Sequence, residues 1–274
     1  MRRRAFRVRL CVRETRWRHL MIRRTGRRPQ PSGEMVWFME GMCFLPTFLV
    51  IWSSSTFIIS YIIALYRQDV DVVLPYISDT GATPPESCVF GFMSTITAFA
   101  AFATMYAEYK FVQRVHERTG AVPPTLNKVS FGFGIFSCIG MCLVATFQET
   151  TVMEVHDFGA LLFFICGLVY AVIQSVIGYR AFPYGSSKFM CHLRTFFSTV
   201  AILAAIPTIA CAVLVGTSKL HWDTDDKDYT RHIVSVACEW ITTFSFVFFF
   251  LTYIQEFQQF TLKLTVNLKE YSGL

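Results

Sequence analysis

The sequence has few charged residues and none of the short motifs that mark the common classes of enzyme. Asp, Glu, Lys and Arg make up 16% of its 274 residues, against about a quarter in soluble domains. The GxSxG, HExxH and Walker A motifs are all missing. We therefore expect a protein that is not an enzyme, and we assign no catalytic and no cofactor-binding residues.

Signs of a disulfide framework, a metal centre and N-glycosylation are also lacking. The chain has nine Cys residues, but no loop contains a pair of them, so the spacing predicts no disulfides. No CxxC motif has a matching second half, which argues against a zinc site. Asn127 and Asn267 are both followed by residues that do not form a glycosylation sequon. We expect neither a metal nor a cofactor.

What the sequence has instead is apolar residues, at 53% of the chain. They form six runs long enough to cross about 30 Å of hydrocarbon at about 1.5 Å per residue. A backbone in lipid must satisfy its own hydrogen bonds, and no run alternates as strands of a barrel do, so helices are expected. The sequence therefore predicts an all-α, polytopic membrane protein, with residues 35–255 forming the membrane domain. The predicted spans are about 42–66, 88–112, 129–147, 157–179, 195–217 and 232–255.

Loop charges predict how these spans are oriented. Short cytosolic loops carry an excess of Lys and Arg, and the loops at 113–128 and 180–194 do so. The loops between them are acidic or mixed, at 67–87, 148–157 and 218–231. We therefore expect both termini in the cytosol, with residues 256–274 as a cytosolic tail.

Residues 1–34 have a different composition from the rest of the chain. They contain twelve Arg against Glu14 and Glu34, whereas the remainder has a net charge of −4. The segment has no long apolar stretch, so it is not a secretory signal peptide, and it has no folded nucleic-acid motif. We expect a disordered basic extension before a natural start at Met35; a basic arm that binds anionic lipid is the alternative.

One acidic residue lies deep inside a predicted span. Glu239 is about 10 Å from the outer boundary, and Ser60 lies at a similar depth in the first span. Ser235 and Thr242 share a helical face with Glu239. Intramembrane carboxylates are costly and usually face other helices or a wet cavity, so these four residues form a candidate polar site. A proton or cation relay is one interpretation; a hydrogen-bonded packing residue is the one we favour.

The first outer loop contains turn-forming residues, among them Pro75, Tyr76, Asp79 and Gly81. They are candidates for a shaped surface that binds a partner or a lipid headgroup. The alternative, which we favour, is a rigid connection between the first two helices.

The chain ends in a possible sorting signal. Tyr271 is followed three residues later by Leu274, a spacing similar to the tyrosine-based signal that clathrin adaptors read in cytosolic tails. This ending predicts a lysosomal or endosomal address.

Several short motifs lie at the predicted membrane boundaries. They are FLP at 44–46, WSS at 52–54, PYISDTG at 75–81, PPES at 84–87, ATFQE at 145–149, VHD at 155–157, KLHW at 219–222, CEW at 238–240 and FLTYIQEFQ at 250–258. These motifs resemble those of the damage-regulated autophagy modulator (DRAM) family, and the short tail is similar to that of its stress-induced member. The resemblance extends from Met35 to about residue 263.

The resemblance implies a lysosomal membrane protein that promotes autophagy and stress-induced apoptosis. It implies no catalytic residues, so we expect a scaffold or lipid organiser whose partners are the bilayer, autophagy proteins and clathrin adaptors. The wider superfamily includes regulators of phosphoinositide synthesis and lipid asymmetry at the plasma membrane, which is the alternative function and location.

Overall fold

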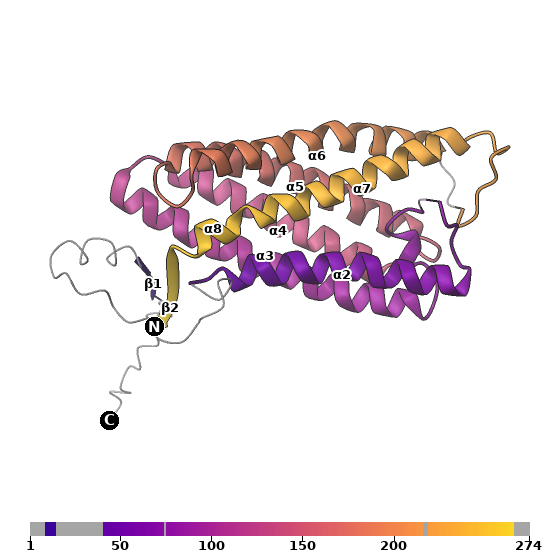
Figure 1. Ribbon diagram of the computed structural model, residues 1–274, viewed down its shortest axis with the longest axis horizontal. Helices are drawn as coiled ribbons and strands as arrows, with labels where there is room; N and C mark the ends of the chain where they lie inside the picture. Colours follow the sequence, from indigo (N-terminus) through magenta and orange to yellow (C-terminus); the bar gives the residue numbers. More distant parts are fainter. Residues whose placement is uncertain (1–8, 15–40, 74, 216–218, 266–274) are drawn as a thin grey trace, which may run out of the picture.

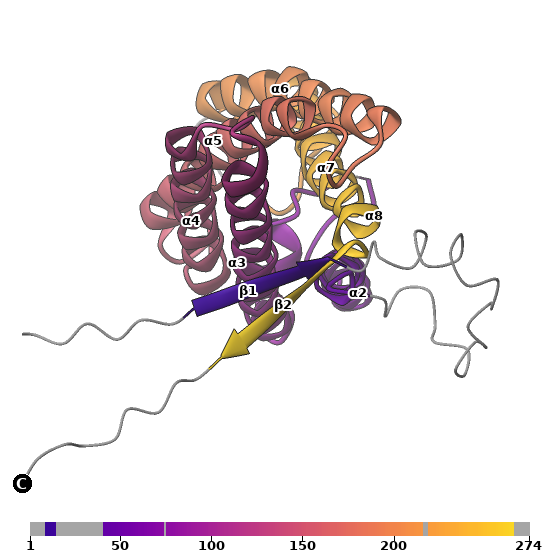
Figure 2. The same cartoon turned by 90° about the vertical axis from the view of Figure 1, so that its left-hand side faces the viewer.

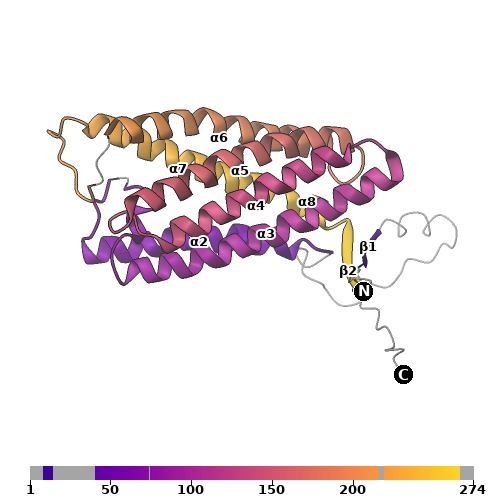
Figure 3. The ribbon, with the colours of Figure 1, turned by 180° about the vertical axis from the view of Figure 1, so that it is seen from behind.

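The computed structural model describes residues 9–14, 41–73, 75–215 and 219–265, with side chains from 41 to 262 (Figures 1 and 3). Six of its helices are long and apolar enough to cross a membrane, which confirms the predicted all-α membrane fold. The elements are β1 (Arg9–Glu14), α2 (Phe44–Arg67), η2 (Asp79–Gly81), α3 (Glu86–Thr119), α4 (Pro124–Thr146), α5 (Met153–Ala181), α6 (Lys188–Val215), α7 (Tyr229–Leu251), α8 (Tyr253–Phe257) and β2 (Phe260–Thr265).

Several helices extend beyond the apolar runs that predicted them. Helix α3 continues to Thr119, seven residues past its predicted end at 112, and α5 begins at Met153 where 157 was expected. Hydropathy detects only the part of a helix that lies in hydrocarbon, whereas backbone hydrogen bonding continues into the polar ends. Helix α8 follows α7 after Thr252 and prolongs the last span.

The six long helices form a ring. Going round it, each helix packs against the next in chain order, and α7 closes the ring against α2. The end-on view shows this arrangement, with α6 on the outside next to α5 and α7 (Figure 2). Large apolar side chains such as Ile51, Phe92 and Leu203 point outward and are more than 60% exposed. Such a surface matches a lipid environment, because lipid tails are as apolar as these side chains.

The connections divide the molecule into two ends. We call the end formed by loops 68–85, 147–152 and 219–228 the acidic end, and the end formed by loops 120–123 and 182–187 the basic end. The second name refers to Arg114, Arg118, Arg180 and Lys188 in the helix ends beside these two loops, because the loops themselves carry no charged residue. Which end faces the cytosol stays a prediction.

A short two-stranded sheet lies at the basic end. Strands β1 and β2 pair antiparallel, with Arg9 opposite Thr265 and Glu14 opposite Phe260. This pairing differs from the expectation of a disordered extension at 1–34 and a tail at 256–274, because strand pairing between distant segments leaves no local signal in the sequence. The other residues of the leader lie outside the described ranges, as do Tyr271 and Leu274 of the expected sorting signal.

Candidate functional site

The loop between α2 and α3 turns inward at the acidic end. Pro75, Ile77, Asp79 and Thr80 are buried, and Asp79–Gly81 forms one turn of 3₁₀ helix. A side chain at Gly81 would meet the Phe90 ring at 2.6 Å, so this position requires glycine. The loop thus fills this end of the bundle. Of the candidate residues Pro75, Tyr76, Asp79 and Gly81, only Tyr76 is partly exposed.

Helices α2 and α7 hold this loop by hydrogen bonds. The hydroxyls of Ser60 and Thr80 are 2.9 Å apart. The backbone N–H of Ile77 donates to Glu239 Oε2 at 3.0 Å. The indole N–H of Trp240 donates to the carbonyl of Pro75 at 2.9 Å. Two residues of the predicted polar site, Ser60 and Glu239, therefore act on the same loop.

Three carboxyl groups gather around the loop. Asp79 Oδ2 accepts a hydrogen bond from the N–H of Tyr76 at 3.2 Å, and the Ser78 hydroxyl donates to Glu149 Oε2 at 3.1 Å. Burial raises the pKa of Asp79 well above its usual range, and the negative charges of Glu149 and Glu239 raise it further. Burial also raises the pKa of Tyr76. Low dielectric and like charges both disfavour the ionised forms here.

The raised pKa of Asp79 predicts a pH dependence of stability. In the unfolded chain Asp79 ionises near pH 4, whereas in the folded chain it holds its proton to higher pH. At low pH Asp79 is protonated in both states and does not change the free energy of unfolding. As the pH rises toward the folded-state pKa, the free energy of unfolding falls. Asp79→Asn keeps the oxygen that accepts from Tyr76 and removes the titration. We expect the variant to have a higher Tm than wild type at about pH 8 and a similar Tm at about pH 4.

The measurement is thermal unfolding of the detergent-solubilised protein across this pH range. Asp225→Asn, an exposed change at the same end, is the control and should follow the wild-type curve. Identical pH slopes for wild type and Asp79→Asn would show that Asp79 ionises normally in the folded protein.

The other two residues of the predicted polar site have further partners, although Ser235 also hydrogen-bonds Tyr76 of the loop between α2 and α3. The Ser235 hydroxyl donates to the carbonyl of Thr208 at 2.8 Å and so joins α7 to α6. The Thr242 hydroxyl donates to the carbonyl of Cys238 in its own helix, also at 2.8 Å. A shared helical face is wide enough to contact different neighbours, which spacing alone does not reveal.

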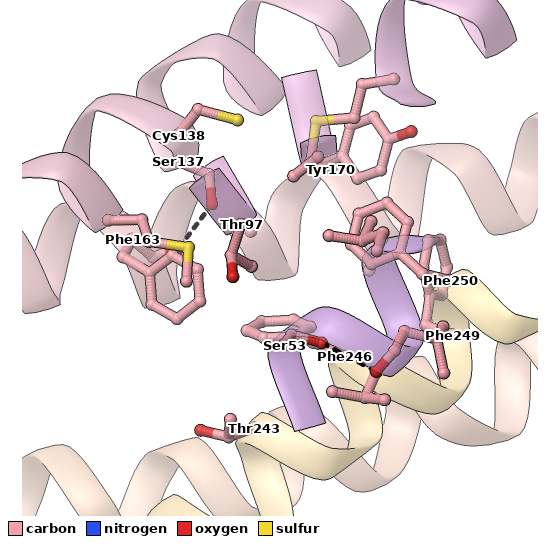
Figure 4. A pocket seen from close by; sticks show the side chains of 18 of the residues that line it. Ser53, Thr97, Ser137, Cys138, Phe163, Tyr170, Thr243, Phe246, Phe249 and Phe250 are labelled. Carbon is pink, nitrogen blue, oxygen red and sulfur yellow. Dashed lines mark hydrogen bonds between the residues drawn. The ribbon is translucent and has the colours of Figure 1, made fainter. Parts of the chain in front are cut away.

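Two cavities adjoin this cluster inside the bundle. The one next to the loop has about 70 Å³ of free space and is lined by Ile77, Ser94, His156 and Glu239 among others. The second, with about 60 Å³, lies deeper among apolar side chains (Figure 4). The sequence analysis missed Ser94, because a serine within an apolar run gives no distinguishing signal.

The basic end contains a second buried polar cluster that sequence reasoning missed. Arg194 of α6 is 1% exposed, and its Nη2 lies 2.7 Å from Glu256 Oε2. Its Nε donates to the Thr252 hydroxyl at 3.1 Å, and its guanidinium lies 4.3 Å from the centre of the Tyr253 ring. Arg194 was counted as a charge of the loop 180–194, but α6 already begins at Lys188 and turns this side chain inward.

Within the described ranges, no group of three or more His, Cys, Asp or Glu side chains is placed to hold a metal ion. At the acidic end, Asp79 and Glu239 accept hydrogen bonds from backbone N–H groups of the loop, and Ser60 and Glu149 contact the hydroxyls of Thr80 and Ser78. These contacts hold the loop in place.

Comparisons with known proteins agree with this architecture. Residues 41–260 match a family described as the Frag1/DRAM/Sfk1/Cwh43P N-terminal domain. DNA damage-regulated autophagy modulator protein 1 is 48% identical over 236 residues in Mus musculus, with 86% of this chain and 99% of that protein covered. The Homo sapiens form is 48% identical over 234 residues, with 85% and 98% covered.

A second relative is more distant. DNA damage-regulated autophagy modulator protein 2 of Mus musculus is 42% identical over 242 residues, which cover 85% of this chain and 90% of that protein. No solved structure matches the chain. The family match spans most of the chain, and the relatives are matched almost from end to end. The chain therefore belongs to the Frag1/DRAM/Sfk1/Cwh43P family.

Proposed function

We propose that this protein promotes autophagy and stress-induced apoptosis from the lysosomal membrane, as a scaffold or lipid organiser without catalytic activity. The observation that carries the proposal is the 48% identity to relatives named as autophagy modulators, over nearly their whole length. Six helices long and apolar enough to cross a membrane support a membrane location for this action. The expected orientation puts the acidic end in the lumen and the basic end in the cytosol.

The structure offers a physical reason for a scaffold. At the acidic end, Ser60, Glu239 and Trp240 fix the loop 75–82 to two helices, and Thr150 donates to the carbonyl of Ala82 at 3.2 Å. A loop held at several points presents a constant shape, and a preformed surface loses less entropy on binding a partner.

The test is autophagic flux in cells lacking the protein, during stress and after rescue. We expect reduced flux, restored by wild type. Rescue with Tyr271→Ala/Leu274→Ala should move the protein to the cell surface and restore less flux, because the tail would no longer engage clathrin adaptors. Lys269→Ala in the same tail is the control. Unchanged flux in the knockout would refute the proposal, and wild-type protein at the plasma membrane would favour the lipid-regulator alternative.

A further inference from the structure

The two cavities inside the bundle adjoin each other, and we call the pair the internal space. They share four lining residues, Phe57, Met141, Phe163 and Thr243. Along α3 the lining runs from Phe90 to Met105, a length of about 22 Å at about 1.5 Å per residue. The long axis of the space therefore follows the helices and the direction of a lipid chain in the surrounding bilayer.

The deeper part of this space offers almost only apolar contacts. Leu49, Met105, Val247 and Phe250 line it, and Figure 4 shows the aromatic rings around it. Three of its hydroxyls have partners in the backbone, and the hydroxyl of Tyr170 pairs with that of Tyr253. Ser53 donates to the carbonyl of Val50 at 3.3 Å, Thr97 to that of Met93 at 3.0 Å, and Ser137 to that of Phe163 at 3.0 Å.

The part next to the loop is polar and acidic. Glu239 is 9% exposed and uses Oε2 for the N–H of Ile77. Ser94 is 2% exposed, and its hydroxyl has no hydrogen-bond partner in the described part of the chain. A buried hydroxyl without a partner is costly, and this one lines the same cavity as Glu239. It points to a polar group of a ligand.

The charge at this end is not balanced by basic side chains. The ion pairs of the acidic end that fall within the described residues join Arg67, Lys219, Arg231 and His221 to other acids. None of them contacts Glu239, Asp79 or Glu149. A cation bound beside Glu239 would supply the missing charge in a low-dielectric setting, where such a pair is strong.

We propose that this space binds a single-chain lipid with a protonated amino head, the chain lying among the apolar residues and the amine between Glu239 and Ser94. The free volumes, about 60 and 70 Å³, are smaller than one lipid chain, so a single chain enters only when the lining side chains move aside, and paired chains do not fit. Met105 and Met141 line the space, and their flexible side chains adapt to a chain that enters. A phosphate or carboxylate head would find no Lys or Arg side chain among the lining residues to pair with.

The experiment uses the purified full-length protein in nanodiscs and three probes that share one chain: octadecylamine, octadecanol and stearic acid. Binding is measured by the rise in Tm and by competition with a photoreactive long-chain amine, whose cross-links are located by mass spectrometry. We expect octadecylamine to bind at least about tenfold more tightly than octadecanol, the equivalent of one charge-assisted hydrogen bond, and stearic acid to bind least. Cross-links should fall on residues that line the space.

Variants separate the amine site from general lipid binding. Glu239→Gln keeps an oxygen for the N–H of Ile77 and should weaken octadecylamine by about tenfold while leaving octadecanol unchanged. Glu154→Gln, an exposed acid near the same end, is the matched control and should bind like wild type. Met141→Trp fills the junction between the two cavities and should abolish all binding, which keeps the proposal testable if Glu239→Gln fails to fold.

Equal affinity for the three probes, unchanged amine binding by Glu239→Gln, or cross-links confined to outward-facing residues would each overturn the proposal. Because binding is measured on purified protein, its outcome is independent of the proposed role in autophagy.

Discussion

Replacing Arg194 with Met is expected to destabilise the protein by about 3–5 kcal/mol, the usual effect of removing one partner from a buried ion pair. Arg194 and Glu256 are both nearly inaccessible, and their closest atoms are 2.7 Å apart. Glu108 is also buried in this cluster at 1% exposure, and one of its oxygens has no hydrogen-bond partner within the described ranges. Without the guanidinium, two carboxyl groups would remain in the interior with no cation.

The geometry explains why this residue has such a large effect. Arg194 connects α6 to Thr252 and Glu256 at the end of the last span. The loop 182–187 is connected to the same group, because the Ser186 hydroxyl donates to Glu256 at 2.8 Å. One planar group with several donors connects these segments, an arrangement that Lys cannot copy. We therefore expect Arg194→Lys to be destabilised too, though less than Arg194→Met.

Thermal unfolding in detergent measures the effect, with an expected fall in Tm of about 10 °C for Arg194→Met. Arg114→Met is the matched control, since it breaks an exposed ion pair with Glu117 and should cost less than about 1 kcal/mol. In the double variant Arg194→Met/Glu256→Met, much of the loss should be recovered, because no uncompensated charge is left at position 256. Equal Tm values for Arg194→Met and Arg114→Met would contradict the role of the pair.

The two clusters show why the sequence predicted the spans but not the polar interior. Each span is a local property, since a run of apolar residues of the right length has few alternatives to a membrane helix. Glu239 was also identifiable, because a carboxylate within such a run is costly wherever it points. Its partner, the N–H of Ile77, is 162 positions away, and only the packing of α7 against the loop reveals it.

Arg194 shows the opposite case. A basic residue near the edge of an apolar run is normally assigned to the flanking loop, where it contributes to the orientation of the spans. Here the helix begins six residues earlier, at Lys188, and the side chain points into the bundle. Whether a boundary residue lies in the loop or points into the bundle depends on where its helix starts and which face it occupies. The apolar content of the sequence determines neither.

Helices α4 and α5 approach each other at two glycines, Gly140 and Gly159. A Cβ atom at Gly140 would clash with the backbone N of Phe163 and lie 2.6 Å from the carbonyl oxygen of Gly159. These are backbone atoms of α5, so no side-chain rotation relieves the clash and the helices must separate. Small residues permit such close approach in membranes, where packing itself drives helix association.

We therefore expect Gly140→Ala to cost about 1–3 kcal/mol, the usual range for overpacking, and Gly140→Val to cost more. Gly132→Ala lies in the same helix and is the control, because nothing lies within 4 Å of its added Cβ. Alanine favours helix over glycine by about 0.5–1 kcal/mol, so Gly132→Ala should be neutral or slightly stabilising. A lower Tm for Gly140→Ala together with an unchanged or higher Tm for Gly132→Ala would identify the contact with α5 as the cause. If Gly140→Ala were as stable as Gly132→Ala, α4 and α5 would have to lie farther apart than the structure places them.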